Sequence, residues 1–295
     1  MKRLGQNFLT SYAIARRIAE AADIGPSDTI LEIGPGKGIL TEAILEKNPK
    51  KLIAVEKDKR FIGLLRDKFS EVGNLEIVEG DMLEVLNSKL PSTNYKPAKG
   101  EVRQGRQIPN SKFKLLNTNY KIVANIPYYI TSRLLRLIFS QKNPPERVTL
   151  MIQKEVAERI CAKPPRMNLL ALSVQVYGKP KIAFRVSRQF FKPAPKVDSA
   201  VIVLDNISRG FFREKKASPF NKRRRLFSEK EFFCLLHAGF RQKRKMLLKN
   251  LKNSEIGFIN LTGIFKKCRI SEKARAENLA LEDWRCLMSA PKDKI

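Results

Sequence analysis

The chain has 295 residues, of which 43% are hydrophobic, and this is enough for one full α/β core and a smaller second unit. Its 58 Lys and Arg residues against 29 Asp and Glu residues give a formal net charge of +29. An excess of this size favours a polyanionic partner, nucleic acid above all, over a merely solvated basic surface. The excess lies entirely after Val85, because residues 1–85 hold 13 basic and 14 acidic side chains.

Several function classes are disfavoured. The single histidine, His237, lies in a lysine-rich segment, which argues against a catalytic triad. The four cysteines are scattered without a C-x-x-C pair. We therefore expect reduced, mostly buried thiols and no metal site. No apolar run approaches the roughly 20 residues of a membrane span and no signal pattern opens the chain, so we expect a cytoplasmic protein.

Strands and helices alternate in the first part of the chain. After a helix over Ser11–Ala22, short apolar runs predict strands, and a helix follows each of the first two; the runs are Thr29–Ile33, Lys51–Val55 and Leu75–Val78. The pattern predicts a parallel, doubly wound α/β sheet. It resumes after residue 119 with strands at Lys121–Ala124 and Val148–Ile152, and helices beginning near Thr131 and Lys154.

Residues 87–119 interrupt this pattern with a polar, basic stretch, which we interpret as a surface insertion and a candidate RNA-binding loop. Two extended runs, Leu172–Val186 and Val197–Leu204, are expected to form the closing hairpin of the sheet. A basic linker is expected at 209–230, between the domain that contains the sheet (1–208) and a helical domain (231–295), in the basic part of the chain that the charge excess suggests binds nucleic acid.

The first chemical motif follows the first strand of the sheet. Gly34, Gly36 and Gly38 have the spacing G-x-G-x-G, preceded by Glu32, and glycines let a backbone approach a nucleoside closely. A nicotinamide site would need glycine at Ile39. The spacing is similar to the first motif of S-adenosylmethionine methyltransferases, although a merely structural turn remains an alternative.

Acidic residues end the next two strands. Glu56 follows the glycines by about 20 residues, where a carboxylate can accept hydrogen bonds from both ribose hydroxyls. Asp81 is expected to bind the adenine amine of the same cofactor. Each acid alone could be an ordinary strand end, but together with the turn they favour nucleoside binding.

The fourth strand ends in Asn125-Ile126-Pro127-Tyr128-Tyr129, which resembles the N/D-P-P-Y/F motif of amino-methylating enzymes. The Asn125 side-chain carbonyl and the Ile126 backbone carbonyl could accept the two hydrogens of an adenine N6 amine. Pro127 would fix the backbone and Tyr128 would stack on the base. We therefore interpret residues 125–128 as catalytic, with no general base required.

With these motifs in hand, the chain resembles the KsgA-type (RsmA) small-subunit ribosomal RNA adenine dimethyltransferases. The resemblance covers nearly the whole chain and includes four further segments: Gly5–Leu9, Gln153–Ile160, Phe191–Val201 and Phe240–Leu251. It implies a Rossmann-like catalytic domain, a small helical C-terminal domain, and dimethylation of two adjacent adenosines near the 3′ end of small-subunit (16S) rRNA. It also implies that the substrate is that RNA or an immature small subunit; we expect the enzyme to be a monomer.

The resemblance also implies residue roles. S-adenosylmethionine would contact Asn7, Leu9, Gly34, Gly36, Glu56, Asp81 and Asn125. Phe191 would enclose the target adenine, and the rRNA phosphates would contact Arg241, Lys243, Arg244 and Lys245. The sequence departs from the family in the longer insertion and at Asn168-Leu169-Leu170, where a glycine-containing segment is usual.

Three alternatives remain at this point. An erythromycin-resistance-type methylase acting on large-subunit rRNA shares the turn and an NIPY-like motif, but the segments beginning at Phe191 and Phe240 favour the small-subunit family. A non-catalytic assembly factor would not need intact Gly34, Glu56 and Asp81. A DNA adenine methylase is the third.

Overall fold

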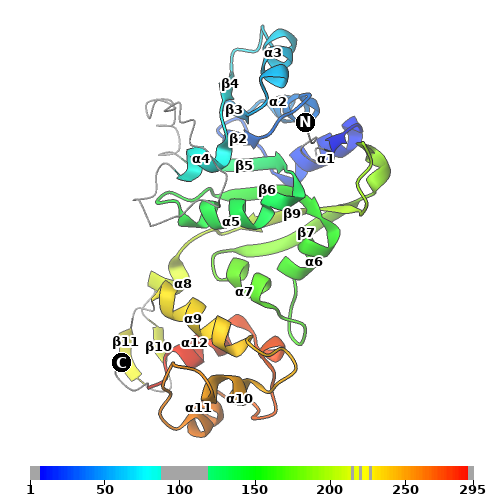
Figure 1. Ribbon diagram of the computed structural model, residues 1–295. Helices are drawn as coiled ribbons and strands as arrows, with labels where there is room; N and C mark the ends of the chain where they lie inside the picture. The colour runs from blue at the N-terminus through cyan, green and yellow to red at the C-terminus, as the bar shows by residue number, and fades with distance from the viewer. Residues whose placement is uncertain (1–6, 88–118, 214–215, 219–220, 226–227, 292–295) are drawn as a thin grey trace, which may run out of the picture. The chain divides into compact units, whose positions relative to one another are not determined.

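The computed structural model describes residues 7–87, 119–213, 216–218, 221–225 and 228–291 (Figure 1). The interior of the expected insertion at 87–119 lies outside them. The chain forms two compact units: the first contains 1–157 and 181–207, and the second contains 158–180 and 208–295. The units change after residue 207, and residues 158–180 belong to the second unit although they lie within the expected domain 1–208. The expected domains themselves remain a prediction.

The first unit is built on a seven-stranded sheet of order β4-β3-β2-β5-β6-β9-β7. Adjacent strands from β4 to β6 are parallel and β9 is antiparallel to β6, as the Rossmann-like expectation required. The strands are β2 (Thr29–Ile33), β3 (Lys51–Glu56), β4 (Leu75–Glu79), β5 (Tyr120–Asn125), β6 (Arg147–Gln153), β7 (Lys179–Val186) and β9 (Ser199–Asp205). Chain order reverses between β2 and β5, and such a switch point opens a ligand crevice at the carboxyl ends of the strands.

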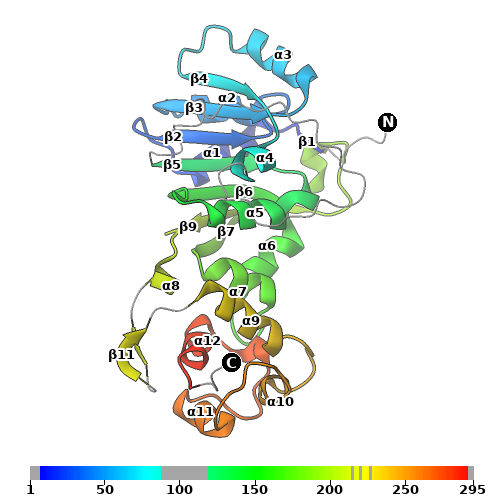
Figure 2. The same ribbon diagram turned by 60° about the vertical axis from the view of Figure 1, so that its left-hand side comes forward.

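Helices cover both faces of this sheet (Figure 2). One core joins α1 and α2 to the strands through buried side chains such as Ile18, Ile44, Leu52 and Val123. Helices α4 and α5 contact each other on the opposite face. The helices are α1 (Tyr12–Ala21), α2 (Ile39–Leu45), α3 (Lys59–Lys68), α4 (Met82–Asn87), α5 (Thr131–Ser140) and α6 (Lys154–Ile160). Both faces of the central strands are therefore buried, which explains their near-continuous apolar sequences.

One secondary-structure prediction was wrong. The run expected to begin an extended strand at Leu172 forms a helix, α7 (Leu169–Gln175), and only β7 is extended. The Asn168 side chain accepts a hydrogen bond from the Ala171 backbone N–H at 3.0 Å and begins the helix, as N-cap residues do. The segment that replaces the family's usual glycine thus carries a helix cap.

The second unit is mainly helical. Its helices are α7, α8 (Gly210–Arg213), α9 (Glu229–Gly239), α10 (Leu247–Lys252), α11 (Leu261–Lys267) and α12 (Leu281–Met288). The 209–230 segment is not a structureless linker, because it contains α8 and an antiparallel pair, β10 (Lys216–Ser218) and β11 (Asn221–Arg225). Phe211 and Phe212 of α8 are buried and their rings pack on Phe232 of α9.

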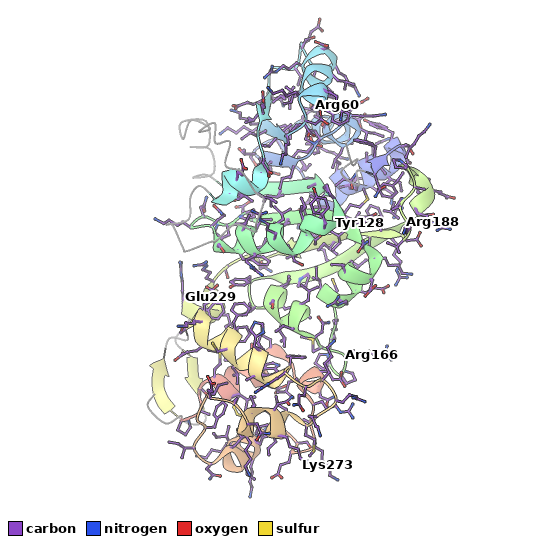
Figure 3. All side chains as sticks on the ribbon, in the orientation of Figure 1. Arg60, Tyr128, Arg166, Arg188, Glu229 and Lys273 are labelled. Atoms are coloured by element: carbon purple, nitrogen blue, oxygen red, sulfur yellow. A yellow bond between two sulfur atoms is a disulfide. The ribbon has the colours of Figure 1, made fainter. Side chains whose placement is uncertain are left out.

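Tight packing in the second unit explains Gly239. The rings of Phe240 and Trp284 stack with centroids 5.7 Å apart, and a Cβ added at Gly239 would lie 2.4 Å from the Trp284 ring. No side chain fits there without displacing the indole. Elsewhere in the unit, the Tyr177 hydroxyl donates a hydrogen bond to the carboxylate of Glu229, which is one of the residues labelled in Figure 3.

The prediction of reduced, mostly buried cysteines was wrong, because one pair is oxidised and none of the four is buried. Cys268 and Cys286 form a disulfide with Cα atoms 5.8 Å apart, whereas Cys161 and Cys234 are free. The bond joins the end of α11 to α12. Nothing in the spacing of the cysteines indicated it, because the tertiary fold brings the two residues together.

Opening this disulfide should destabilise the second unit. Its residues are 18 apart in sequence, and closing a loop of similar length contributes about 3 kcal/mol. Trp284, the only tryptophan of the chain, is fully buried in α12, so its fluorescence reports on this unit. In urea, Cys268→Ser/Cys286→Ser should unfold at lower concentration than the oxidised protein, and Cys234→Ser should not. Equal midpoints for the oxidised and double-serine proteins would contradict a stabilising disulfide.

Candidate active site

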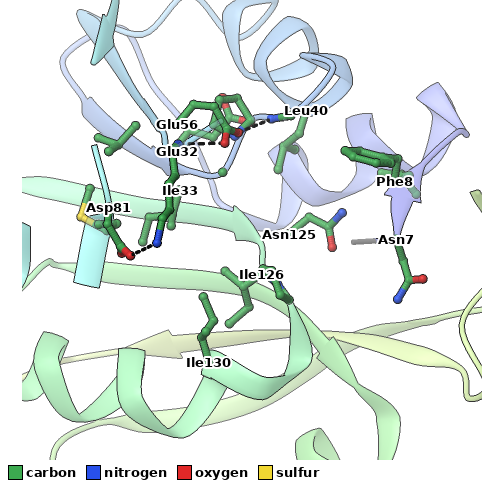
Figure 4. A pocket seen from close by; sticks show the side chains of 18 of the residues that line it. Asn7, Phe8, Glu32, Ile33, Leu40, Glu56, Asp81, Asn125, Ile126 and Ile130 are labelled. Carbon is green, nitrogen blue, oxygen red and sulfur yellow. Dashed lines mark hydrogen bonds and ion pairs between the residues drawn. The ribbon is translucent and has the colours of Figure 1, made fainter. Parts of the chain in front are cut away.

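A cavity of about 430 Å³ lies at the carboxyl ends of β2, β3, β4 and β5. Its walls come from the turns after these strands, from the N-terminal segment 7–9 and from Phe191. Figure 4 shows lining side chains that include Asn7, Glu56, Asp81 and Asn125. Among the described residues, no group of three or more His, Cys, Asp or Glu side chains could hold a metal ion, and no helix is long and apolar enough to cross a membrane.

The glycine turn forms one wall of the cavity. Gly34 has φ +68°, and a Cβ built there would meet no protein atom within 4 Å. This backbone therefore faces open space in a conformation that other residues rarely adopt. A larger side chain would occupy the space into which a ligand could fit.

Glu56 ties the glycine turn to the next strand. One carboxylate oxygen, Oε2, accepts the Gly36 N–H at 3.0 Å. The other, Oε1, accepts the N–H groups of Lys57 and Asp58 at 2.8 and 2.9 Å. The carboxylate is buried but both of its oxygens are hydrogen-bonded, so its orientation is fixed before any ligand arrives.

Asp81 stands at the end of β4 with both oxygens engaged. Oδ1 accepts the Leu83 N–H at 2.9 Å, and Oδ2 accepts a hydrogen bond from the Lys57 ammonium at 2.9 Å. This hydrogen bond raises the pKa of Lys57. Lys57 thus balances the charge of the acid expected to bind the adenine amine.

Glu32 is a second buried acid in the cavity wall. It is 1% exposed, its Oε2 accepts the Thr41 hydroxyl at 2.7 Å, and its Oε1 has no partner among the described residues. Burial raises the pKa of Glu32 to about 8 against the partly compensating Thr41 hydrogen bond. The carboxyl is therefore mostly protonated at neutral pH.

Residues 125–128 lie opposite the glycine turn. Asn125 is the last residue of β5 and pairs with Met151 of β6; its side chain lies between the strand end and the Asn7–Phe8 segment (Figure 4). Tyr128 begins the short 3-10 helix η2 (Tyr128–Ile130) and its hydroxyl lies 2.7 Å from that of Ser199. Burial raises the pKa of Tyr128, so the phenol stays neutral.

A two-stranded ribbon closes the cavity. Strand β1 (Phe8–Leu9) pairs antiparallel with β8 (Phe191–Lys192), with Leu9 opposite Phe191. The Thr10 backbone N–H extends this pairing by donating to the Phe190 carbonyl at 2.8 Å. Strand β1 and Phe191, the residue expected to enclose the base, therefore belong to the same two-stranded ribbon.

The structure brings most of the predicted site residues into one cavity. All cofactor candidates, residues 125–128 and Phe191 line it, but the roles assigned to them remain proposals. Arg241, Lys243, Arg244 and Lys245 belong to the second unit. The sequence analysis assigned no role to several other lining residues, among them Phe8, Lys37, Tyr129 and Arg133. Each of these residues lies in or near a motif that had been assigned to the site, and this proximity in sequence could have indicated them.

Glu32 should make stability fall with rising pH. Between its ordinary pKa of 4.5 and the folded value of about 8, the folded protein binds more protons than the unfolded chain, so stability decreases as pH rises through this range. Glu32→Gln removes the titration. Its melting temperature relative to wild type should rise from pH 5.5 to pH 8.5 by about 5 °C or more, measured by calorimetry without ligand.

Glu20→Gln is a suitable control, since the Glu20 side chain is 54% exposed. A difference between Glu32→Gln and wild type that does not change with pH would show that Glu32 is ionised throughout.

Comparison with known proteins agrees with this geometry. The family model described as ribosomal RNA adenine dimethylase matches residues 1–290. The ribosomal RNA small subunit methyltransferase A of Dehalococcoides mccartyi is 36% identical over 97% of this chain and 86% of its own. That of Fusobacterium nucleatum is also 36% identical, over 96% and 94%.

Solved structures share the fold. A dimethyladenosine transferase from Plasmodium falciparum has a TM-score of 0.67 at 26% identity, covering 95% of both chains. The 23S rRNA methyltransferase ErmE has a TM-score of 0.66 at 23% identity, covering 96% of this chain and 98% of that one. Given the match over nearly its whole length, the chain belongs to the ribosomal RNA adenine dimethylase family and is an S-adenosylmethionine-dependent enzyme that dimethylates adenines of ribosomal RNA.

Proposed function

We propose that the enzyme dimethylates the N6 amines of two adjacent adenosines near the 3′ end of small-subunit (16S) ribosomal RNA. The observation that carries the proposal is that the glycine turn and residues 125–128 line the same cavity. The names of the 36% identical relatives favour the small subunit over the large-subunit target of ErmE. An immature small subunit is the proposed substrate, bound by a monomer in the cytoplasm.

The cavity residues fit S-adenosylmethionine, which supplies an electrophilic methyl group on a sulfonium. Gly34 offers backbone beside open space. Glu56 holds a carboxylate, already oriented by backbone N–H groups, for the ribose hydroxyls, and Asp81 offers an acceptor for the adenine amine. Asn7 and Leu9 would cover the cofactor from the β1 side.

Residues 125–128 would hold the amine in line for transfer. The lone pair of an aromatic amine is delocalised into the ring, so two carbonyls that accept its hydrogens, those of Asn125 and Ile126, would favour the reactive pyramidal geometry. Tyr128 and Phe191 would hold the adenine. Because the amine gains the positive charge with the methyl group and then loses a proton to water, the site needs no ionisable base.

A rigid basic turn in the second unit supports contact with RNA phosphates. Arg241, Lys243, Arg244 and Lys245 are exposed. The side-chain amide of the buried Asn250 donates hydrogen bonds to the Gly239 and Gln242 carbonyls at 2.6 and 3.1 Å. Because the backbone of this turn is already held, RNA binding would have to order only the side chains.

The direct test is incubation of undermethylated small ribosomal subunits with labelled S-adenosylmethionine, followed by mass spectrometry of the digested RNA. N6,N6-dimethyladenosine near the 3′ end is the expected product. Label in large-subunit RNA alone would favour the activity of ErmE-type enzymes, and cofactor binding without any transfer would favour an assembly factor.

Asn125→Ala should slow methyl transfer by at least about two orders of magnitude while the protein stays folded, as loss of one preorganised dipole can do. Single-turnover rates with the same subunits measure this, and calorimetry should detect retained cofactor binding. Asn143→Ala, on a half-buried loop residue before β6, is a matched amide deletion away from the cavity. A wild-type rate for Asn125→Ala would remove this residue from the catalytic role.

Neutralising the basic turn should weaken RNA binding in a salt-dependent way. Lys243→Ala/Arg244→Ala should lower affinity for small-subunit RNA and reduce the slope of log K against log salt by about 1–2, since each phosphate contact contributes roughly 0.7–0.9. Lys50→Ala/Lys142→Ala removes two exposed charges next to the amino ends of β3 and β6 and should leave the slope unchanged. Equal slopes for both double variants and wild type would exclude the turn from phosphate contact.

A further inference from the structure

A hydrogen bond between two side chains distant in sequence reaches into the active site. The hydroxyl oxygens of Tyr128 and Ser199 lie 2.7 Å apart, although the residues are 71 positions apart in the chain. Tyr128, labelled in Figure 3, follows β5 directly after the Asn125-Ile126-Pro127 sequence, whereas Ser199 is the first residue of β9. The bond therefore links the proposed base-binding aromatic to a strand two places away in the sheet.

Ser199 is itself held firmly. It is fully buried and pairs with Gln153 in the β6–β9 ladder. Its neighbour Asp198 accepts the Lys154 backbone N–H at 3.0 Å through its own carbonyl and the Arg188 N–H through its carboxylate. The serine hydroxyl thus occupies a fixed point, and a buried hydroxyl needs a partner.

Tyr128 is anchored at its other end as well. Its backbone carbonyl accepts the Thr131 hydroxyl at 3.0 Å at the start of α5, and the half-buried side chain lines the cavity with Asn125 and Phe191. With both the backbone and the phenol oxygen held, rotation of the ring is restricted. Stacking on a base requires the ring plane to be parallel to the base plane.

We propose that Ser199 is a positioning residue for methyl transfer, which holds the Tyr128 ring in the plane on which the target adenine stacks. This inference rests on the proposed function of Tyr128. Ser199 touches neither substrate nor cofactor in this role and acts through the tyrosine. The second transfer depends on it most, because a monomethylated amine keeps a single hydrogen for the carbonyls of Asn125 and Ile126 and relies more on the base being held flat.

The test removes the hydrogen bond from either side. Ser199→Ala, Tyr128→Phe and the double variant are compared with wild type in single-turnover methylation of undermethylated small subunits at saturating S-adenosylmethionine. Each single variant should lose about 10-fold in rate, as expected for one hydrogen bond. The double variant should be no slower than either single one, because both changes remove the same interaction. N6-monomethyladenosine should accumulate in all three.

Thr149→Val is the matched control. Thr149 is a fully buried hydroxyl residue on β6, and its oxygen has no partner among the described residues, so its removal should change neither the rate nor the ratio of mono- to dimethyladenosine. A variant that merely lost folded protein would leave that ratio unchanged. Should Ser199→Ala fail to fold, Tyr128→Phe alone tests the same bond from the surface of the cavity.

The outcomes separate this inference from the proposed function. Wild-type enzyme that leaves small subunits unmodified overturns both. If the wild-type enzyme does dimethylate the subunits, three results would each overturn the positioning role alone. They are a wild-type rate for Ser199→Ala or Tyr128→Phe, additive losses in the double variant, and an unchanged ratio of mono- to dimethyladenosine.

Discussion

The site depends above all on the carboxylate of Glu56. This one side chain accepts hydrogen bonds from three backbone N–H groups, those of Gly36, Lys57 and Asp58, and so joins the turn after β2 to the turn after β3. A buried carboxylate is stable only when hydrogen-bonded in this way. The glycine turn gains an anchor in return, which holds the cavity wall in place before a ligand binds.

The buried acids and phenol around this anchor divide the electrostatic roles. Glu56 is held by N–H dipoles and Asp81 by the Lys57 ammonium, whereas Glu32 has only the Thr41 hydroxyl and takes up a proton near neutral pH. Tyr128 stays neutral for the same reason, burial. Glu56 and Asp81, the two acids expected to contact the cofactor, are thus each compensated by hydrogen-bond donors of the chain itself.

The parallel strands and the active-site turns could be predicted from sequence because their signals are local. A strand buried on both faces is mostly apolar, as in residues 52–55 of β3, and a backbone that approaches a nucleoside requires glycine at fixed spacing. Features that join residues distant in sequence could not be predicted. The Tyr128–Ser199 bond and the Cys268–Cys286 disulfide exist only in the folded chain. Helix α7 was missed because its alternating apolar residues suit a strand, while a single cap, Asn168, decides for helix.

The chain passes between its two units three times, since residues 158–180 belong to the second unit although the first resumes after them. Helix α7 in that segment contacts α9, and the Met167 N–H donates to the Glu277 carbonyl. A fragment cut at residue 208 would therefore retain α7 but lose these partners. Because the first unit is discontinuous in sequence, a single cut does not separate it from the second; a permuted or internally shortened chain would be the suitable design.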